Sequence, residues 1–261
     1  MEHVSKAQIK LVRSLQHKKF RDELGLFVAE GDKCINELRK GFELVHFFRE
    51  GENATATEIE QMSGLRAPQG SIAVFKKSNS AAVSLLTAQR SNSPQDGLVV
   101  VLDGIQDPGN LGTIIRTCDW FGVKQIICSL DTADCYNPKV VQATMGSLAR
   151  VKVKYVDLPQ WLAEIKNQKS KIKNIPIFGT LLEGENMYNV LQSSINRQSS
   201  IVQSSIIVMG NEGNGISEEV RKYITHPIRI PSYPESAETA ESLNVSIATA
   251  VVLAEFRRPS N

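Results

Sequence analysis

The sequence predicts an α/β protein whose larger part is a parallel sheet with helices on both faces. From residue 98 onward, five short apolar runs alternate with helical stretches. The runs are LVVVLD, QIIC, VKVKYV, IPIFGT and SIIVMG, and the helical stretches are 114–121, 161–165 and 245–256. This alternation is typical of strands buried on both faces of a parallel sheet. Ligands of such sheets bind beyond the carboxyl ends of the strands, so the loops that follow the runs are the candidate site.

A smaller α/β unit precedes this sheet. The first third of the chain alternates LFVAEG, a helix near 32–39, ELVHFF, a helix near 57–62, and SIAVFKK. The segment QRSNSPQDG that follows is polar and rich in Ser, Asn, Pro and Gly, which is typical of a linker. We therefore expect a smaller α/β domain at 1–90, a linker at 91–97 and a second domain at 98–261.

The composition limits the classes of protein that are possible. The 261 residues are 41% hydrophobic and 22% charged, enough to bury one substantial core and a smaller second one. No run approaches the roughly 18 apolar residues of a membrane helix, and MEHVSKAQIK lacks an apolar signal core. We expect a cytoplasmic protein that does not enter a membrane. The four cysteines form no CxxC pair and the four histidines are scattered, so we expect packed, reduced thiols and no metal site.

A basic stretch stands at the start of the chain, although the net charge is only +2. In SKAQIKLVRSLQHKKFRDELGLFVAEG, apolar residues at helical spacing leave one face to pack while another presents cations. Basic clusters suit nucleic acid, whereas a solvated helix face is the alternative. The candidate phosphate contacts are Lys10, Arg13, Lys18 and Lys19.

Two of the loops after predicted strands carry polar residues at the start of a helix. In LDGIQDPGNLGTIIRTCDWFG, Pro and Gly shape a turn, Asn110 stands at or near the helix start and Arg116 lies on its first turns. In IRIPSYPESAETAESLNVSIATA, Ser242 and Asn244 precede a nearly all-apolar helix. Each of these residues alone is compatible with a helix cap or a surface cation, and together they are compatible with the wall of a small-molecule site.

The third loop, VMGNEGNGIS, combines three glycines with an acid, Glu212. A dinucleotide fingerprint needs its glycines in the first strand-to-helix turn of a βαβ unit and its acid about 20 residues later. This loop comes late in the chain, has its acid inside and lacks a Walker lysine. A dinucleotide or triphosphate is therefore not expected. The loop suits a cationic or hydroxyl-rich ligand that the backbone can approach closely.

Taken in order, DPGNLGTIIRT, VMGNEGNGIS and IPSYPESAETAESLNVSIATA resemble the three motifs of the SpoU (TrmH-type) RNA ribose 2′-O-methyltransferases of the SPOUT superfamily. The first third resembles the substrate-binding domain that many members carry, with FVAEGDKCINEL as the matching core. The resemblance covers nearly the whole chain. It implies a trefoil-knotted α/β catalytic domain, an exception to the rule that chains avoid knots, and a homodimer with its sites at the subunit interface.

The resemblance also implies roles for individual residues. Arg116 matches the residue most closely tied to catalysis, and the expected catalytic set is Asn110, Arg116, Glu212, Ser242 and Asn244. The expected contacts to S-adenosylmethionine are Gly210, Ile230 and Leu243. The turn SYPESAETAE departs from the family pattern, because it is longer and contains no glycine.

The implied function is S-adenosylmethionine-dependent methylation of a ribose 2′-hydroxyl in structured RNA. The additional N-terminal domain favours ribosomal RNA over transfer RNA. The alternatives are a transfer RNA methyltransferase and a catalytically silent RNA-binding or ribosome-assembly protein. Because a guanidinium stays charged in proteins and is a poor base, Arg116 either stabilises the developing alkoxide or acts as a base when a phosphate or partner subunit alters its state.

Overall fold

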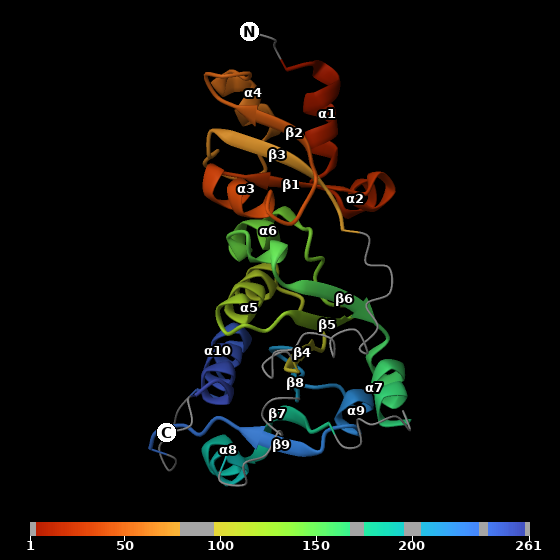
Figure 1. The fold of residues 1–261 in the computed structure, drawn as a ribbon, viewed down its shortest axis with the longest axis vertical. Coiled ribbons are helices and arrows are strands. Elements are labelled where there is room, and N and C mark those ends of the chain that lie inside the picture. The colour runs from red at the N-terminus through yellow and green to blue at the C-terminus, as the bar shows by residue number, and fades with distance from the viewer. Residues whose placement is uncertain (1–3, 79–96, 168–174, 196–204, 235–239, 259–261) are drawn as a thin grey trace.

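The computed structural model describes residues 4–78, 97–167, 175–195, 205–234 and 240–258. Figure 1 shows a small sheet toward the N-terminal end of the molecule and a larger sheet toward the other end. The predicted α/β class, with a parallel sheet and a smaller domain before it, is confirmed. The predicted linker lies outside the described residues except for Gly97, so the domain boundaries stay a prediction.

The N-terminal domain is a three-stranded antiparallel sheet in the order β1-β3-β2. Its strands are β1 (Leu26–Glu30), β2 (Leu44–Arg49) and β3 (Ser71–Lys76). Its helices are α1 (Lys6–Ser14), α2 (Lys18–Leu24), α3 (Asp32–Leu38) and α4 (Ala56–Met62). The basic stretch, expected to be one helix, forms two, because His17 is extended and starts α2 anew. This break lets both Leu15 and Arg21 be buried.

The C-terminal domain is a six-stranded parallel sheet in the order β6-β5-β4-β8-β7-β9. Its strands are β4 (Val99–Leu102), β5 (Gln125–Ser129), β6 (Lys152–Val156), β7 (Ile177–Asn186), β8 (Ile206–Met209) and β9 (His226–Arg229). The five apolar runs all become strands. The sixth strand, β9, was not predicted because Ile228 is its one buried residue.

Helices cover both faces of this sheet. They are α5 (Pro108–Trp120), α6 (Pro138–Thr144), α7 (Leu158–Asn167), α8 (Met187–Ile195), α9 (Glu218–Arg221) and α10 (Val245–Phe256). Alternate residues of β4 enter two different cores, Val100 and Leu102 on the side of α5 and α10, Val99 and Val101 on the side of α7 and α9. Figure 1 shows these helix pairs on opposite sides of the sheet. The tract 192–205, expected to be a loop, belongs to α8 as far as residue 195, and 196–204 lie outside the described residues.

The cysteines are packing residues, as predicted. All four are free and buried. Burial raises the pKa of the Cys34 thiol to about 11 and that of Cys135 to about 12, so both stay protonated near neutral pH. Within the described ranges, no helix is both long and apolar enough to cross a membrane.

The two domains share one hydrophobic core. Phe27 and Phe75 of the small sheet belong to the same buried cluster as residues of the parallel sheet, and the ring of Phe27 lies 4.9 Å from that of Tyr136. Beside them, the guanidinium of Arg21, 2% exposed, donates to Asp134 Oδ2 at 2.6 and 3.1 Å. Arg21 Nη1 also donates to the carbonyls of Leu15 and Gln16, both at 2.9 Å. Arg21 therefore joins the domains and is not available to RNA.

Replacing Arg21 by Met should lower the free energy of unfolding by about 3–5 kcal/mol, because Asp134, whose side chain is only 11% exposed, would keep its charge without its partner. Urea denaturation followed by circular dichroism measures this. The matched control is Lys19→Met on the same helix, whose side chain is 77% exposed and lies 3.9 Å from Glu23. Equal stabilities for the two variants would contradict a structural role for the ion pair.

Candidate active site

The loops after β4 and β8 lie side by side at the carboxyl edge of the parallel sheet. Asn211 Nδ2 donates to the carbonyl of Gly104 at 2.7 Å, and the amide of Ser217 donates to Asp103 Oδ2 at 2.8 Å. Because β4 and β8 are adjacent and parallel, their ends meet at one edge. Two hydrogen bonds, one near each end of the loop after β8, therefore fix this loop to the segment after β4.

Three predicted site residues meet above these loops. Asn110 Nδ2 donates to Glu212 Oε1 at 2.6 Å, and Asn244 Nδ2 donates to Asn110 Oδ1 at 3.0 Å. Each residue comes from a different motif, and together they span a long part of the chain, since Asn110 lies 102 positions from Glu212 and 134 from Asn244. We call Asn110, Glu212 and Asn244 the polar triad.

The local structure of two helices explains why the triad can form. Asp107 caps α5 by accepting from the amide of Asn110 at 2.8 Å, and Pro108 takes the first helical position. Asn110 is thus inside the helix and is not its cap, so its side-chain amide is free to bridge Glu212 and Asn244. Asn244 does cap α10, accepting from the amide of Ser246 at 2.9 Å, and uses its Nδ2 for the triad.

The glycine-rich loop closes on itself. Asn211 and Gly215 exchange backbone hydrogen bonds of 2.9 Å, and Asn211 Oδ1 accepts from the amides of Gly213 and Asn214 at 2.8 and 3.1 Å. A Cβ at Gly210 would lie 2.3 Å from the carbonyl carbon of Gly215. Gly210 is therefore required by the loop's own backbone, which passes where a side chain would stand. The loop presents Glu212 outward, exposed to solvent.

Arg116 does not join the triad within one chain. It is exposed on α5, and in the described part of the chain no hydrogen bond or ion pair connects it to Asn110, Glu212 or Asn244. Six helical positions separate it from Asn110, which corresponds to a rise of about 9 Å and a rotation of about 240°. Trp120, one turn later on the same face, is 85% exposed.

Three further expected site residues lie on the segment between Glu212 and Asn244. Ser242 is exposed, Leu243 is 52% exposed, and Ile230 is half-buried directly after β9. Residues 235–239 of the long, glycine-free turn lie outside the described residues. Across the described ranges, no group of three or more His, Cys, Asp or Glu side chains is arranged to hold a metal ion.

Two residues that organise the site were not predicted. Asn211 holds the glycine-rich loop, and Asp103 fixes the loop's far end through Ser217. Asp103 directly follows β4 and Asn211 comes two positions after the end of β8, and this place at the end of a buried strand is the signal that could have identified them. The glycines and the acid drew attention to the loop, whereas Asn211 has no distinctive spacing.

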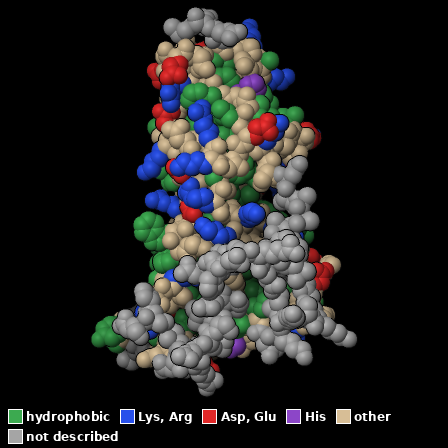
Figure 2. Space-filling view, in the orientation of Figure 1, with side chains coloured by type: hydrophobic (Ala, Val, Ile, Leu, Met, Phe, Trp, Pro, Cys, Tyr) green, Lys and Arg blue, Asp and Glu red, His purple; other side chains and the backbone are tan. Residues whose placement is uncertain are grey.

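The expected RNA contacts Lys10, Arg13, Lys18 and Lys19 are all exposed on α1 and α2. Figure 2 shows a second group of Lys and Arg side chains, in a column over the α3 side of the molecule that continues toward α5. Exposed cations in this region are Arg39, Lys40, Lys139 and Arg150. They come from segments far apart in sequence, so no basic run in the sequence predicts this group. Part of the column is neutralised, since Lys40 and Arg150 both pair with Glu37.

Comparison with protein families gives two matches. The SpoU rRNA Methylase family matches residues 97–254, which include the whole polar triad. The MRM3-like substrate binding domain matches residues 6–78, which include α1 to α4.

Individual proteins also match, one of them over nearly the full length of the chain. The 23S rRNA (guanosine(2553)-2′-O)-methyltransferase RlmP of Bacillus subtilis is 26% identical, covering 98% of this chain and 98% of its own. The 23S rRNA (guanosine-2′-O-)-methyltransferase RlmB of Neisseria meningitidis is 32% identical over 64% of this chain and 60% of its own.

Two solved structures have the same fold over nearly the full length. A TrmH-family structure from Porphyromonas gingivalis is 33% identical with a TM-score of 0.78, covering 98% of this chain and 99% of its own. An AdoMet-bound rRNA methyltransferase of Sinorhizobium meliloti is 27% identical with a TM-score of 0.77, covering 98% and 97%.

The glycine-rich loop gives a direct test of this geometry. Gly210→Ala should destabilise the protein by about 1–3 kcal/mol, because the added Cβ collides with backbone that cannot withdraw as a side chain would. Thermal unfolding measures the loss, and hydrogen exchange at Gly215 reports the opening of the loop. The matched control is Gly213→Ala, where the nearest atom to a new Cβ is Asn211 Oδ1 at 3.5 Å. If both variants melt together, the loop is not packed as described.

Proposed function

The chain belongs to the SpoU rRNA Methylase family, and we propose that it transfers a methyl group from S-adenosylmethionine to a ribose 2′-hydroxyl of structured RNA, with ribosomal RNA as the substrate class. The polar triad is the observation that carries this proposal. Three separate motifs each supply one side chain to a single hydrogen-bonded group at the carboxyl edge of a parallel sheet. A protein that kept the fold and lost the chemistry would have no reason to keep this convergence, which argues against the silent RNA-binding alternative.

The residues present fit S-adenosylmethionine. When bound, this cofactor supplies an electrophilic methyl group on a positively charged sulfur. We propose main-chain contacts at Gly210, Ile230 and Leu243. Leu243 leaves an apolar side chain 52% exposed beside the triad, which a flat adenine ring would cover, and Glu212 supplies a negative charge nearby. The AdoMet-bound structure of the Sinorhizobium relative supports S-adenosylmethionine as the cofactor.

The chain's own residues have two tasks in this reaction. The 2′ oxygen must be aligned, and the negative charge that develops as it loses its proton must be stabilised. We assign alignment to the amides of Asn110 and Asn244, which are held in place by their hydrogen bonds within the triad, Glu212 included, with the exposed Ser242 nearby in sequence. We assign charge stabilisation to Arg116, since a guanidinium remains charged and offers several donors.

A homodimer completes this assignment. Helices α5 and α10 pack together and leave Arg116, Trp120 and Ile247 facing outward, with Trp120 85% and Ile247 52% exposed. A large exposed apolar group of this kind marks an interaction surface. We propose that a second copy covers it, so that Arg116 of one subunit serves the triad of the other. Mixed dimers of Arg116→Ala and Glu212→Gln should then regain activity that neither variant shows alone.

The N-terminal domain is proposed to dock the RNA. Its exposed cations lie on a domain that the Arg21–Asp134 ion pair fixes to the catalytic domain. The match to RlmP spans both domains, which supports ribosomal RNA rather than transfer RNA as the substrate. The family's trefoil knot and a cytoplasmic location are parts of the same proposal.

Arg116→Ala should reduce methyl transfer by about 100-fold or more, because one preorganised donor to a developing oxyanion is worth that much. Ribosomal RNA from cells that lack the gene and radiolabelled S-adenosylmethionine provide the assay. Arg116→Lys should recover little, because lysine lacks the planar fork. Cofactor affinity, measured by calorimetry, should be unchanged, and Lys166→Ala on the opposite face is the control. Near-normal turnover of Arg116→Ala would show that the catalytic assignment is wrong.

Changing Lys10, Arg13, Lys18 and Lys19 together to Ala should weaken RNA binding and flatten its dependence on salt. Each lost phosphate contact lowers the slope of log K against log salt by about one unit for a duplex. RNA affinity at two salt concentrations measures this, with Lys152, Lys154, Lys166 and Lys222 changed to Ala as the control for the loss of four charges. An unchanged slope would mean that these residues form a solvated helix face only.

A further inference from the structure

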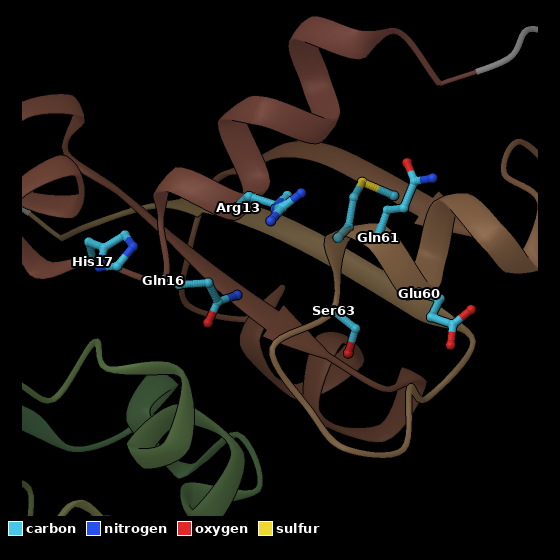
Figure 3. Close-up of a pocket in the computed structure, with 7 residues that line it drawn as sticks. Arg13, Gln16, His17, Glu60, Gln61 and Ser63 are labelled. Carbon is cyan, nitrogen blue, oxygen red and sulfur yellow. The ribbon is translucent and has the colours of Figure 1, made fainter.

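A pocket opens in the N-terminal domain, apart from the polar triad. It has a volume of about 430 Å³, within the range of about 300–1,000 Å³ that is usual for small-molecule sites. Figure 3 shows that its lining comes from the turn between α1 and α2 on one side and from the end of α4 on the other. The side chains that matter for its chemistry are Arg13, Gln16, His17, Glu60, Gln61 and Ser63.

One wall of this pocket is held by buried hydrogen bonds. Glu30, 4% exposed, accepts from the hydroxyl of Ser63 at 2.6 Å and from the amide of Gly64 at 2.8 Å. A Cβ at Gly64 would lie 2.4 Å from Gln16 Oε1, so the absence of a side chain there leaves room for the Gln16 amide. The wall is therefore built around Gln16 and does not depend on a ligand.

Gln16 has an unused donor in this setting. Its Nε2 is buried and has no hydrogen-bond partner within the described residues. A buried amide donor without a partner is unfavourable by about 1–3 kcal/mol, and a ligand acceptor that reached it would relieve this cost. The exposed Gln61 adds a second amide at the rim. Two amides that each donate and accept are suited to the edge of a nucleobase.

The other groups fit a nucleotide better than a free anion. Glu60 stands in the lining with Arg13, so the pocket is not a simple phosphate site, whereas a carboxylate can accept from the amino group of a base. The ring of His17 is exposed, with Phe20 beside it at 6.4 Å, and offers a surface for stacking. The exposed cations of α1 and α2 lie close in sequence to the pocket residues, and they are suited to contact phosphates of the same RNA strand.

We infer that this pocket binds one unpaired nucleobase of the RNA, with Gln16 and Gln61 at its edge, His17 on its face and Arg13 at its phosphate. The inference rests on the proposed function only in taking RNA as the ligand. It gives the N-terminal domain a means of selecting an unpaired position, which phosphate contacts alone do not provide.

The test measures binding of the full chain to short single-stranded RNA homopolymers of each base and to an abasic strand of equal length. Fluorescence anisotropy without cofactor compares wild type with Gln16→Met, Gln61→Met and His17→Ala. The matched control is Gln160→Met, an exposed glutamine on α7. We expect Gln16→Met to weaken binding of at least one homopolymer by about 5-fold or more, with no change for the abasic strand or in the salt slope.

Two outcomes would overturn the inference. One is equal loss of affinity for the abasic strand, which would make these residues backbone contacts. The other is unchanged affinity in all three variants. Because Gln61 and His17 are exposed, their variants keep the test valid if Gln16→Met does not fold. Methyl transfer is not part of this measurement, so a failure of the catalytic proposal would appear in the activity assay alone.

Discussion

The ion pair between Arg21 and Asp134 fixes the position of the N-terminal domain relative to the C-terminal domain. Two separate sheets could sit at many angles, but a guanidinium that is 2% exposed and satisfied by a carboxylate and two carbonyls allows only one. Removing either partner leaves the other, Arg21 at 2% or Asp134 at 11% exposure, charged and without its ion-pair partner, and this penalty stabilises the arrangement. The aromatic contact of Phe27 with Tyr136 fills the space beside it. Any RNA held by α1 and α2 is thereby held at a fixed distance from the parallel sheet.

In the C-terminal domain, the topology of the sheet brings together residues that are far apart in the sequence. Adjacent parallel strands end at the same edge, so the loops after β4 and β8 meet although more than a hundred residues separate them, as the 107 positions between Gly104 and Asn211 show. Asn110 then links both loops to the start of α10. One side chain that donates to Glu212 and accepts from Asn244 makes the three motifs a single unit, which explains why their joint order is more informative than any one of them.

Much of this could be predicted from the sequence, and the parts that could not have physical reasons. Apolar runs identified β4, β5 and β8 because every residue of these strands is buried, whereas β9 has only Ile228 buried and gave no such signal. The triad residues were identified through motifs. Their contacts, however, require that Asp107 caps α5, which leaves the side chain of Asn110 free to form them. Arg21 lies in a basic stretch of the sequence, which predicts an exposed side chain in contact with solvent or RNA. Only the tertiary structure, through Asp134, shows that it is internal.

The position of Arg116 has a consequence for how the proposed enzyme is controlled. On a helix whose third residue belongs to the triad, a side chain six positions later faces away from it by about 120° the short way round, and no rotamer of one residue spans that turn. In the proposed dimer, a second copy packed on α5 and α10 would supply the same guanidinium from the opposite side. In the proposed dimer, the cofactor contacts and the charge-stabilising group then belong to different subunits. Association of the chains would therefore be a condition for catalysis, and an isolated subunit could bind the cofactor without transferring its methyl group.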